Sequence, residues 1–295
     1  MILTGIADEA GALIDTQIKA VKELGWSTIE ARTVEVSGFP KGNLHDIPEP
    51  AFDIVEQKLK DAGVGVYCFG STIANWGKKI DDPFDMSEVD RAIPRMQRLG
   101  TQYVRIMSYA VREGEDQLEE ERFRRLREIT RRFVDAGLTP VHENCMNYGG
   151  MSWKHALRLL ENVPDLKWVF DTANPVFNDD RSLPAPQPKQ DPWEFWHHVK
   201  EHVVHIHVKD AIWDASKNDA DYTLPGEGDA AVHRILKDAM QSGYDAGISI
   251  EPHLAVVFHD DSVKASDEEI YQSFLGYGRA LIALMDRIKS EIAQG

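Results

Sequence analysis

Short apolar runs alternate along the chain with longer segments in which apolar residues recur at helical spacing. The first run covers residues 2–6, and Ile14, Ile18 and Val21 then recur every three or four residues until Gly25 ends the segment. Positions with this spacing form one face of an amphipathic helix, whereas a short apolar run between turn residues is typical of a buried strand. The opening pattern therefore predicts a strand followed by a helix.

The same strand-then-helix unit repeats to the end of the chain. The predicted strands are residues 2–6, 28–31, 64–69, 103–107, 139–143, 167–171, 203–208 and 247–251. The predicted helices are residues 13–24, 51–62, 86–99, 115–136, 153–160, 193–199, 232–241 and 267–292. Such alternation is typical of a parallel sheet, and eight right-handed units of this kind close into a barrel. We predict an α/β fold, a single (β/α)8 TIM barrel that occupies residues 1–295 as one domain.

An open, doubly wound sheet is the alternative fold for this order of elements. Dinucleotide-binding proteins with that fold carry a Gly-rich phosphate-binding turn between the first strand and its helix. The nearest match in this chain, Gly63-Val64-Gly65, is too short and precedes a strand. The barrel is therefore the favoured fold.

Net charge and composition narrow the range of partners. The 295 residues include 33 Lys+Arg and 49 Asp+Glu, which gives a net charge of -16. A surface of that sign repels nucleic-acid phosphates, so we expect no nucleic-acid partner. The sequence shows neither the pattern of a secretory signal nor an apolar run of about 18 residues that could span a membrane. We therefore expect a cytoplasmic protein with no membrane partner.

Metal-type ligands stand at the ends of the last four predicted strands. They are Glu143, Asp171, His207 and Glu251, and one helix-and-strand unit separates each from the next. Because the reactive groups of such a barrel lie at the carboxyl ends of its strands, we expect these four side chains to lie together. Alone, each acid would also suit a turn cap or an ion pair. Together, three crowded carboxylates predict a cation that neutralises them.

Three oxygen ligands and one nitrogen ligand also restrict the choice of ion. This set suits Mn²⁺, Mg²⁺ or Co²⁺ better than a structural zinc ion, whose sites favour thiolates and imidazoles. We predict one divalent metal ion, with Mn²⁺ as the first choice and Mg²⁺, Co²⁺ or Zn²⁺ as the alternatives.

Three further histidines lie next to these positions. His205 precedes His207 by two residues and so shares its side of the strand, which indicates a core or supporting position. His142 points to the opposite side from Glu143, so we interpret it as structural. His253 follows the last strand and is a candidate for the wall of the pocket.

The motifs at these strand ends resemble one protein family. HEN at Glu143, FDTAN at Asp171, HVKD at His207 and IEPH at Glu251, in that order, are similar to the xylose-isomerase-like sugar isomerase and epimerase barrels. The segments at residues 5–11 and 29–32 look like its inosose-dehydratase and sugar-phosphate-isomerase branch. The resemblance spans nearly the whole chain. It implies one divalent metal held by the four residues, with the glutamates Glu143 and Glu251 also serving as the catalytic proton-transfer pair.

Two positions depart from the ketose 3-epimerases of that family. Asn174 stands where they have a histidine, and Lys209 is the nearest cation to the place of their substrate-binding arginine. Lys209 could bind a substrate oxygen or phosphate, act as an acid in a dehydration, or be a solvated strand end. We predict substrate contacts from Lys209, Asn174, Trp76 and His253.

The favoured function is a divalent-metal-dependent isomerase or epimerase of a small sugar or polyhydroxy carbonyl compound. Removal of a proton next to a carbonyl gives an enediolate, which a bound cation stabilises. The alternative is an inosose-type dehydratase, a lyase, on the same metal site. A DNA-repair endonuclease would require more histidine ligands and a basic surface, and a non-catalytic sugar-binding protein would require no proton exchange. The sequence leaves open the sugar and whether the chain forms a homo-oligomer.

Overall fold

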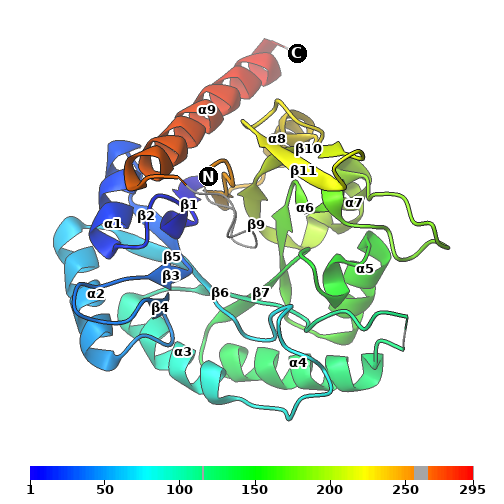
Figure 1. Ribbon diagram of the computed structural model, residues 1–295, viewed down its shortest axis with the longest axis horizontal. Coiled ribbons are helices and arrows are strands. Elements are labelled where there is room, and N and C mark those ends of the chain that lie inside the picture. The colour runs from blue at the N-terminus through cyan, green and yellow to red at the C-terminus, as the bar shows by residue number, and fades with distance from the viewer. Residues whose placement is uncertain (115, 256–264, 295) are drawn as a thin grey trace.

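The computed structural model describes residues 1–114, 116–255 and 265–294 (Figure 1). Eight parallel strands form its central sheet: β1 (Ile2–Gly5), β2 (Thr28–Ala31), β5 (Gly65–Gly70), β6 (Tyr103–Ile106), β7 (Thr139–Glu143), β8 (Lys167–Asp171), β9 (Val203–Val208) and β12 (Gly247–Ile250). They agree with the predicted strands to within two residues at each end. The strand prediction is therefore confirmed.

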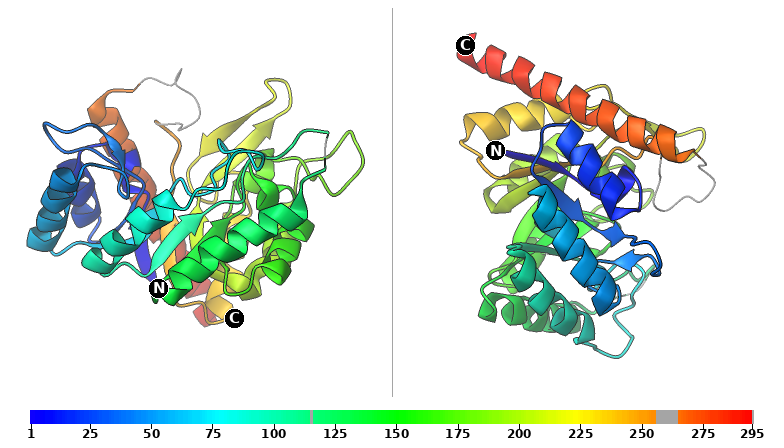
Figure 2. Two further views of the ribbon diagram at one scale, coloured as in Figure 1. Left: turned by 90° about the horizontal axis from the view of Figure 1, so that it is seen from below. Right: turned by 90° about the vertical axis from the view of Figure 1, so that its left-hand side faces the viewer.

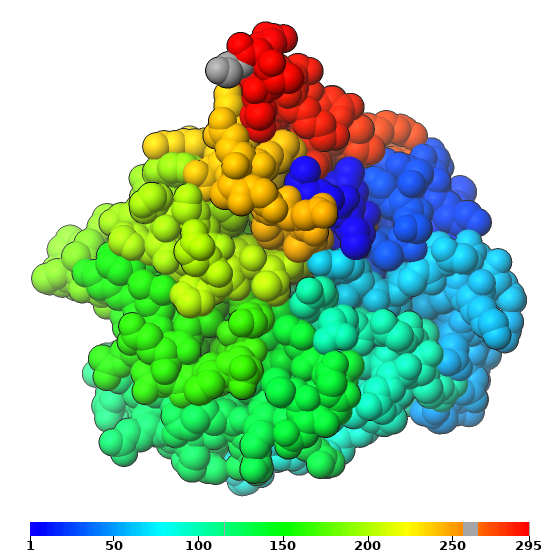
Figure 3. Space-filling view, turned by 180° about the vertical axis from the view of Figure 1, so that it is seen from behind, coloured from blue at the N-terminus to red at the C-terminus, as the bar shows by residue number. Residues whose placement is uncertain are grey.

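The sheet curls into a nearly closed barrel. Its strand order is β1-β12-β9-β8-β7-β6-β5-β2, so the first and last strands of the chain are neighbours. β1 and β2 close the ring through a parallel bridge between Ile6 and Glu30. Figure 3 shows the face opposite to that of Figure 1, where the blue N-terminus lies beside the orange segment that precedes β12. The predicted TIM barrel is confirmed.

Helices surround the barrel and bury their apolar faces against it. The principal ones are α1 (Ile14–Glu23), α2 (Glu49–Ala62), α3 (Ser87–Leu99), α4 (Glu119–Asp135), α5 (Trp153–Asn162), α7 (Pro192–Val199), α8 (Val232–Gln241) and α9 (Asp267–Gln294). Ser152 Oγ and Asp191 Oδ1 accept backbone N–H groups at the starts of α5 and α7, and these bonds fix where the two helices begin.

The start of α4 differs from the prediction. The acidic run near residue 115 suggested a helix there, but the helix begins at Glu119, and Glu115 lies outside the described residues. Leu118 precedes the helix with a φ of 49°, a left-handed conformation that cannot continue a helix. The acidic residues still occupy the first helical turn, where they complement the helix dipole.

Loops at the carboxyl ends of the strands carry elements that the apolar pattern did not predict. They include the antiparallel hairpins β3 (Thr33–Val34) with β4 (Gly42–Asn43) and β10 (Asp210–Asp214) with β11 (Asp219–Thr223), and the short helix α6 (Asn174–Phe177). In the left view of Figure 2 the yellow-green hairpin β10–β11 rises above the barrel. These elements are short and partly exposed, so their sequences lack a distinct apolar period.

The layer between strands and helices differs from the inside of the barrel. Bulky apolar side chains such as Trp168, Phe170 and Phe274 fill the outer layer. Inside the barrel, buried polar and charged side chains lie beneath the strand ends. In the described ranges, no helix is both long and apolar enough to cross a bilayer.

Candidate metal centre

The four predicted ligands come together at the carboxyl end of the barrel. Each of Glu143, Asp171, His207 and Glu251 offers one oxygen or nitrogen atom, and these atoms all lie within 4.8 Å of one another. Asp171 and His207 are direct neighbours in the pairing of β8 with β9. All four residues are buried, with 0–4% of their surface exposed. The structure thus contains a candidate metal site where the strand ends predicted one.

His207 presents a free ring nitrogen to the cluster. Its Nδ1 lies 3.5 Å from Glu143 Oε1 and 3.9 Å from Glu251 Oε2, and it makes no hydrogen bond with any described residue. Its Nε2 is 3.0 Å from an oxygen of Glu30 on the other side of the ring. A buried nitrogen without a hydrogen bond is costly unless it has another partner, and imidazole is a common metal ligand. The donor set therefore fits a divalent ion.

Asp171 lies where negative charge is most crowded. Its Oδ1 accepts hydrogen bonds from the backbone N–H groups of Ala173 and Asn174, at 2.9 and 2.7 Å. Burial, together with the nearby Glu251 and Glu143 carboxylates, raises the pKa of Asp171 to about 7, against the opposing effect of the Lys209 ammonium. Burial and the two carboxylates therefore outweigh Lys209, and a bound cation would stabilise the ionised form of Asp171.

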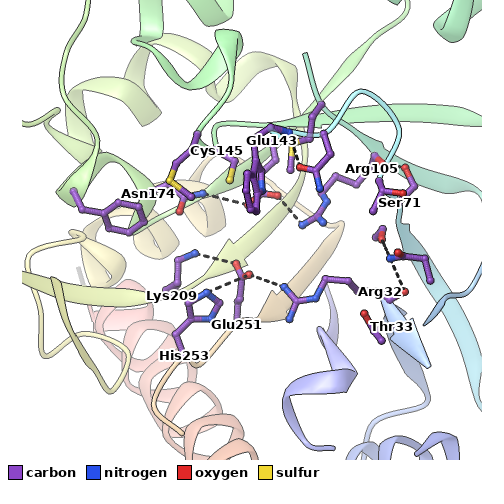
Figure 4. Close-up of a pocket in the computed structure, with 18 residues that line it drawn as sticks. Arg32, Thr33, Ser71, Arg105, Glu143, Cys145, Asn174, Lys209, Glu251 and His253 are labelled. Atoms are coloured by element: carbon purple, nitrogen blue, oxygen red, sulfur yellow. Dashed lines mark hydrogen bonds and ion pairs between the residues drawn. The ribbon is translucent and has the colours of Figure 1, made fainter. Parts of the chain in front are cut away.

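A buried arginine holds each of the two glutamates. Arg105 Nη1 donates to Glu143 Oε2 at 2.8 Å, and Arg32 Nη1 donates to Glu251 Oε1 at 3.3 Å (Figure 4). Burial alone would raise the pKa of Glu143, but Arg105 and His207 outweigh it and lower that pKa to about 2. Lys209, His253 and Arg32 likewise outweigh burial and hold the pKa of Glu251 well below its usual range. Both glutamates are therefore ionised.

The predicted substrate-contacting residues lie around the same cavity. Lys209 Nζ is 3.0 Å from Asp171 Oδ2 and 3.1 Å from Glu251 Oε2, so it is not a solvated strand end. Asn174 Nδ2 donates to Glu143 Oε1 at 3.2 Å.

His253 is held in place by Glu9. Glu9 Oε2 accepts the backbone N–H of His253 at 2.9 Å, and Glu9 Oε1 lies 2.9 Å from His253 Nδ1. His253 adopts a φ of 52°, an uncommon backbone conformation for a residue other than glycine. These contacts orient the imidazole so that its Nε2 lies 3.9 Å from Glu251 Oε1.

A cavity of about 150 Å³ opens above these side chains. The four predicted substrate-contacting residues Lys209, Asn174, Trp76 and His253 all line it. Trp76 is 44% exposed and reaches into a second hollow beside the first. Trp153, the first residue of α5, instead stacks on His198, with 3.7 Å between the ring centroids.

Sequence reasoning missed the two arginines. Arg105 stands inside the apolar strand β6 and Arg32 directly follows β2, and both line the cavity. A charged residue inside a short apolar strand is a usable signal, because burying it requires a partner of opposite charge. Guanidinium groups do not bind metal ions, so the pattern of metal-type ligands at the strand ends did not include them.

Comparisons with known proteins agree with this architecture. The sequence model of the family described as xylose isomerase-like TIM barrel matches residues 18–272. No protein of curated function matches the chain in sequence.

Similar solved structures share the fold at low sequence identity. One is a xylose isomerase-like TIM barrel protein from Mycobacterium smegmatis in complex with magnesium (14% identity, 97% of each chain covered, TM-score 0.67). Another is the probable 3-DHS dehydratase of petrobactin synthesis from Bacillus anthracis (14%, 96% of this chain and 99% of that one, TM-score 0.67). A third is the 3-keto-D-glucoside 4-epimerase from E. coli (14%, 95% and 99%, TM-score 0.62). Because the family match covers most of the barrel, the chain belongs to the xylose isomerase-like TIM barrel family.

Proposed function

We propose that the protein is a divalent-metal-dependent isomerase or epimerase of a small sugar or other polyhydroxy carbonyl compound. The observation that carries the proposal is the convergence of Glu143, Asp171, Glu251 and the unbonded Nδ1 of His207 at the floor of one cavity. When bound there, a divalent ion such as Mn²⁺ supplies Lewis-acid stabilisation of negative charge on substrate oxygens. The M. smegmatis structure with magnesium supports a divalent ion in this fold.

Glu143 and Glu251 are the proposed proton-transfer pair. They project from β7 and from the end of β12, with β8 and β9 between them in the sheet, so they approach the cavity from different sides. One carboxylate accepts the proton from the carbon next to the carbonyl, and the electron pair of the broken C–H bond moves to the carbonyl oxygen as an enediolate. In an isomerisation the same carboxyl group then returns this proton to the neighbouring carbon of the enediolate. In an epimerisation the other glutamate must first take up a proton from water, which it then donates to the opposite face of the carbon. Arg105 and His207 keep Glu143 ionised, and Lys209, His253 and Arg32 keep Glu251 ionised, so either group can be the first proton acceptor.

The remaining cavity residues suit a polyhydroxy substrate. Asn174 and Lys209 place an amide and an ammonium group at the cavity wall, where they can donate to hydroxyl or carbonyl oxygens. Trp76 offers an apolar face for a sugar ring, and His253 borders Glu251. A small-molecule sugar is the proposed partner, with neither nucleic acid nor membrane involved.

A dehydratase of an inosose-like ring is the second candidate. Lys209 favours it, because its buried ammonium lies 3.1 Å from Glu251 and faces the cavity, where it could protonate a departing hydroxyl group. Loss of water needs an acid at the leaving oxygen in addition to a base at carbon. The dehydratase from B. anthracis shows that the fold accommodates an enzyme of that name.

Proton exchange in D₂O tests the proposal. The protein is incubated with Mn²⁺ and a panel of ketoses, inososes and hydroxypyruvate, and C–H exchange is followed by NMR. We expect deuterium at the carbon next to a carbonyl with wild-type protein, and none with His207→Ala, which lacks one ligand. A product lighter by one water would select the dehydratase. Equal signals with wild-type protein and the variant would contradict a metal-dependent reaction at this site.

A further inference from the structure

A fifth carboxylate, Glu30, lies behind the metal centre. It belongs to β2, is fully buried, and is not among the described residues that line the cavity. It therefore cannot contact a substrate held there. Burying a carboxylate costs several kcal/mol unless hydrogen bonds compensate it, so its partners indicate why the position is charged.

Glu30 meets His207 on the side of the ring that faces away from the cluster. His207 Nε2 lies 3.1 Å from Glu30 Oε1 and 3.0 Å from Glu30 Oε2. A carboxylate only accepts hydrogen bonds, so Nε2 is the nitrogen that carries the proton and donates it. In the metal-binding form of the imidazole, Nδ1 then has the lone pair, and Nδ1 is the atom that faces Glu143 and Glu251.

Two further donors hold Glu30 in this position. Ser249 Oγ donates to Glu30 Oε2 at 2.7 Å, and His205 Nε2 lies 2.8 Å from the same oxygen. The pairing of β2 with β5 shifts register between Ile29 and Glu30, which marks a local irregularity where the side chain turns inward. Strands β2, β9 and β12 thus converge on one carboxylate under the candidate site.

We infer that Glu30 is a positioning residue that selects Nδ1 of His207 as the metal ligand and fixes the orientation of its ring. This role rests on the proposed metal-dependent function, because it concerns one of the four ligands. Partners of this kind behind a ligating histidine typically change metal affinity by about 10–100-fold when they are removed.

Glu30→Gln tests the role with little change in shape. The amide keeps one acceptor oxygen, but its NH₂ group replaces the second one. Because the groups around Glu30 are donors, the NH₂ group cannot bond to them, and the hydrogen bond from His207 Nε2–H is weakened. We expect the dissociation constant for Mn²⁺, measured by competition with a fluorescent chelator, to rise about 10–100-fold. Ser249→Ala is the matched control, since it removes a hydroxyl that donates to Glu30 and makes no hydrogen bond to His207, its neighbour on β9. We expect it to change the constant by less than about threefold.

A spectroscopic measurement on the wild-type protein needs no variant that might fail to fold. Zn²⁺ is diamagnetic, and ¹⁵N-histidine labelling with long-range ¹H–¹⁵N correlation distinguishes the two ring nitrogens. We expect His207 to show a protonated Nε2 and a metal-bound Nδ1, with its signals assigned by their absence in His207→Ala. Zinc bound through Nε2 would overturn the inference.

The Mn²⁺ dissociation constants of the two variants can also contradict the inference. An unchanged Mn²⁺ affinity in Glu30→Gln would also overturn the assignment. An equal loss of Mn²⁺ affinity in Ser249→Ala would do the same, because it would show that any disturbance of the hydrogen bonds around Glu30 weakens metal binding. Failure of the proposed function would look different. Wild-type protein would then bind Mn²⁺ and Zn²⁺ but exchange no substrate proton. That result would contradict the isomerase proposal, while the effect of Glu30 on metal binding could still be measured.

Discussion

The two sides of the barrel mouth carry opposite kinds of chemistry. Strands β7, β8 and β9 and the end of β12 deliver the three carboxylates and His207 of the candidate metal site. Across the cavity, Arg105 on β6 and Arg32 after β2 deliver guanidinium groups (Figure 4). Lys209, which follows β9, is the one lysine or arginine on the acidic side among the described residues that line the cavity.

This contrast explains how two carboxylates can be buried and remain ionised, as their proposed role as bases requires. Each arginine contacts one of the proposed proton-transfer glutamates, so Glu143 and Glu251 each have a partner of opposite charge. Asp171 pairs with Lys209 instead of an arginine, and its pKa is raised to about 7. The arginines pair with the proposed proton-transfer glutamates, and the excess negative charge lies at Asp171, where we propose that the metal binds.

The largest expected effect comes from neutralising a base on the acidic side. Glu251→Gln keeps a coordinating oxygen but cannot accept a proton at neutral pH, so turnover should fall by about 10²–10⁴-fold while most of the Mn²⁺ affinity is retained. Steady-state kinetics on an identified substrate and metal analysis measure the two quantities. The exposed Glu201→Gln is the control. Near wild-type turnover in fully loaded Glu251→Gln would contradict the proton-transfer role.

Arg105→Met removes the ion pair between Arg105 and Glu143. Removing one partner of a buried ion pair leaves Glu143 uncompensated, which should lower the free energy of unfolding by about 3 kcal/mol or more. Loss of Arg105 also raises the pKa of Glu143, so the acid limb of kcat/KM should move to higher pH, because the base is protonated earlier.

A surface arginine provides the matched control for this variant. Arg132→Met removes an exposed ion pair with Asp90 and should cost at most about 1 kcal/mol. Urea unfolding measures both variants. Equal losses of unfolding free energy in the two variants would show that the buried ion pair of Arg105 with Glu143 stabilises the fold no more than an exposed pair does. An acid limb of kcat/KM at the wild-type pH would contradict the proposed effect of Arg105 on the pKa of Glu143.

A smaller effect is expected from His142, on the outer face of β7. His142, which neighbours Glu143 on that strand, is buried in the outer layer, where burial lowers its pKa from 6.5 to about 3. The folded protein therefore keeps His142 neutral at pH values where the unfolded chain binds a proton, so stability falls as pH falls below 6.5. Between pH 6.5 and pH 5 this group should cost about 2 kcal/mol.

Urea unfolding at the two pH values measures this cost. His142→Gln should remove most of that pH dependence, while the exposed His202→Gln should leave it unchanged. Identical pH slopes in wild type and His142→Gln would contradict the assignment.

The barrel and the four candidate metal ligands could be predicted from the sequence. The barrel followed from apolar runs that recur with helical segments, and the four ligands followed from their places at strand ends. Arg32, Arg105 and the supporting role of Glu30 could not be predicted in this way. Their roles depend on which side chains face each other across the barrel, such as Glu30 on β2 and His207 on β9, and residue spacing carries no information about such pairs. The hairpin β10–β11 was missed because its alternating positions are partly exposed.

Anomalous diffraction from crystals of the protein soaked in Mn²⁺ tests the central claim most directly. The account predicts one strong manganese peak among Glu143, Asp171, His207 and Glu251, at ligand distances of about 2.0–2.6 Å, with Nδ1 as the histidine ligand. A structure without manganese at these four side chains, or with the ion held elsewhere on the barrel, would contradict it.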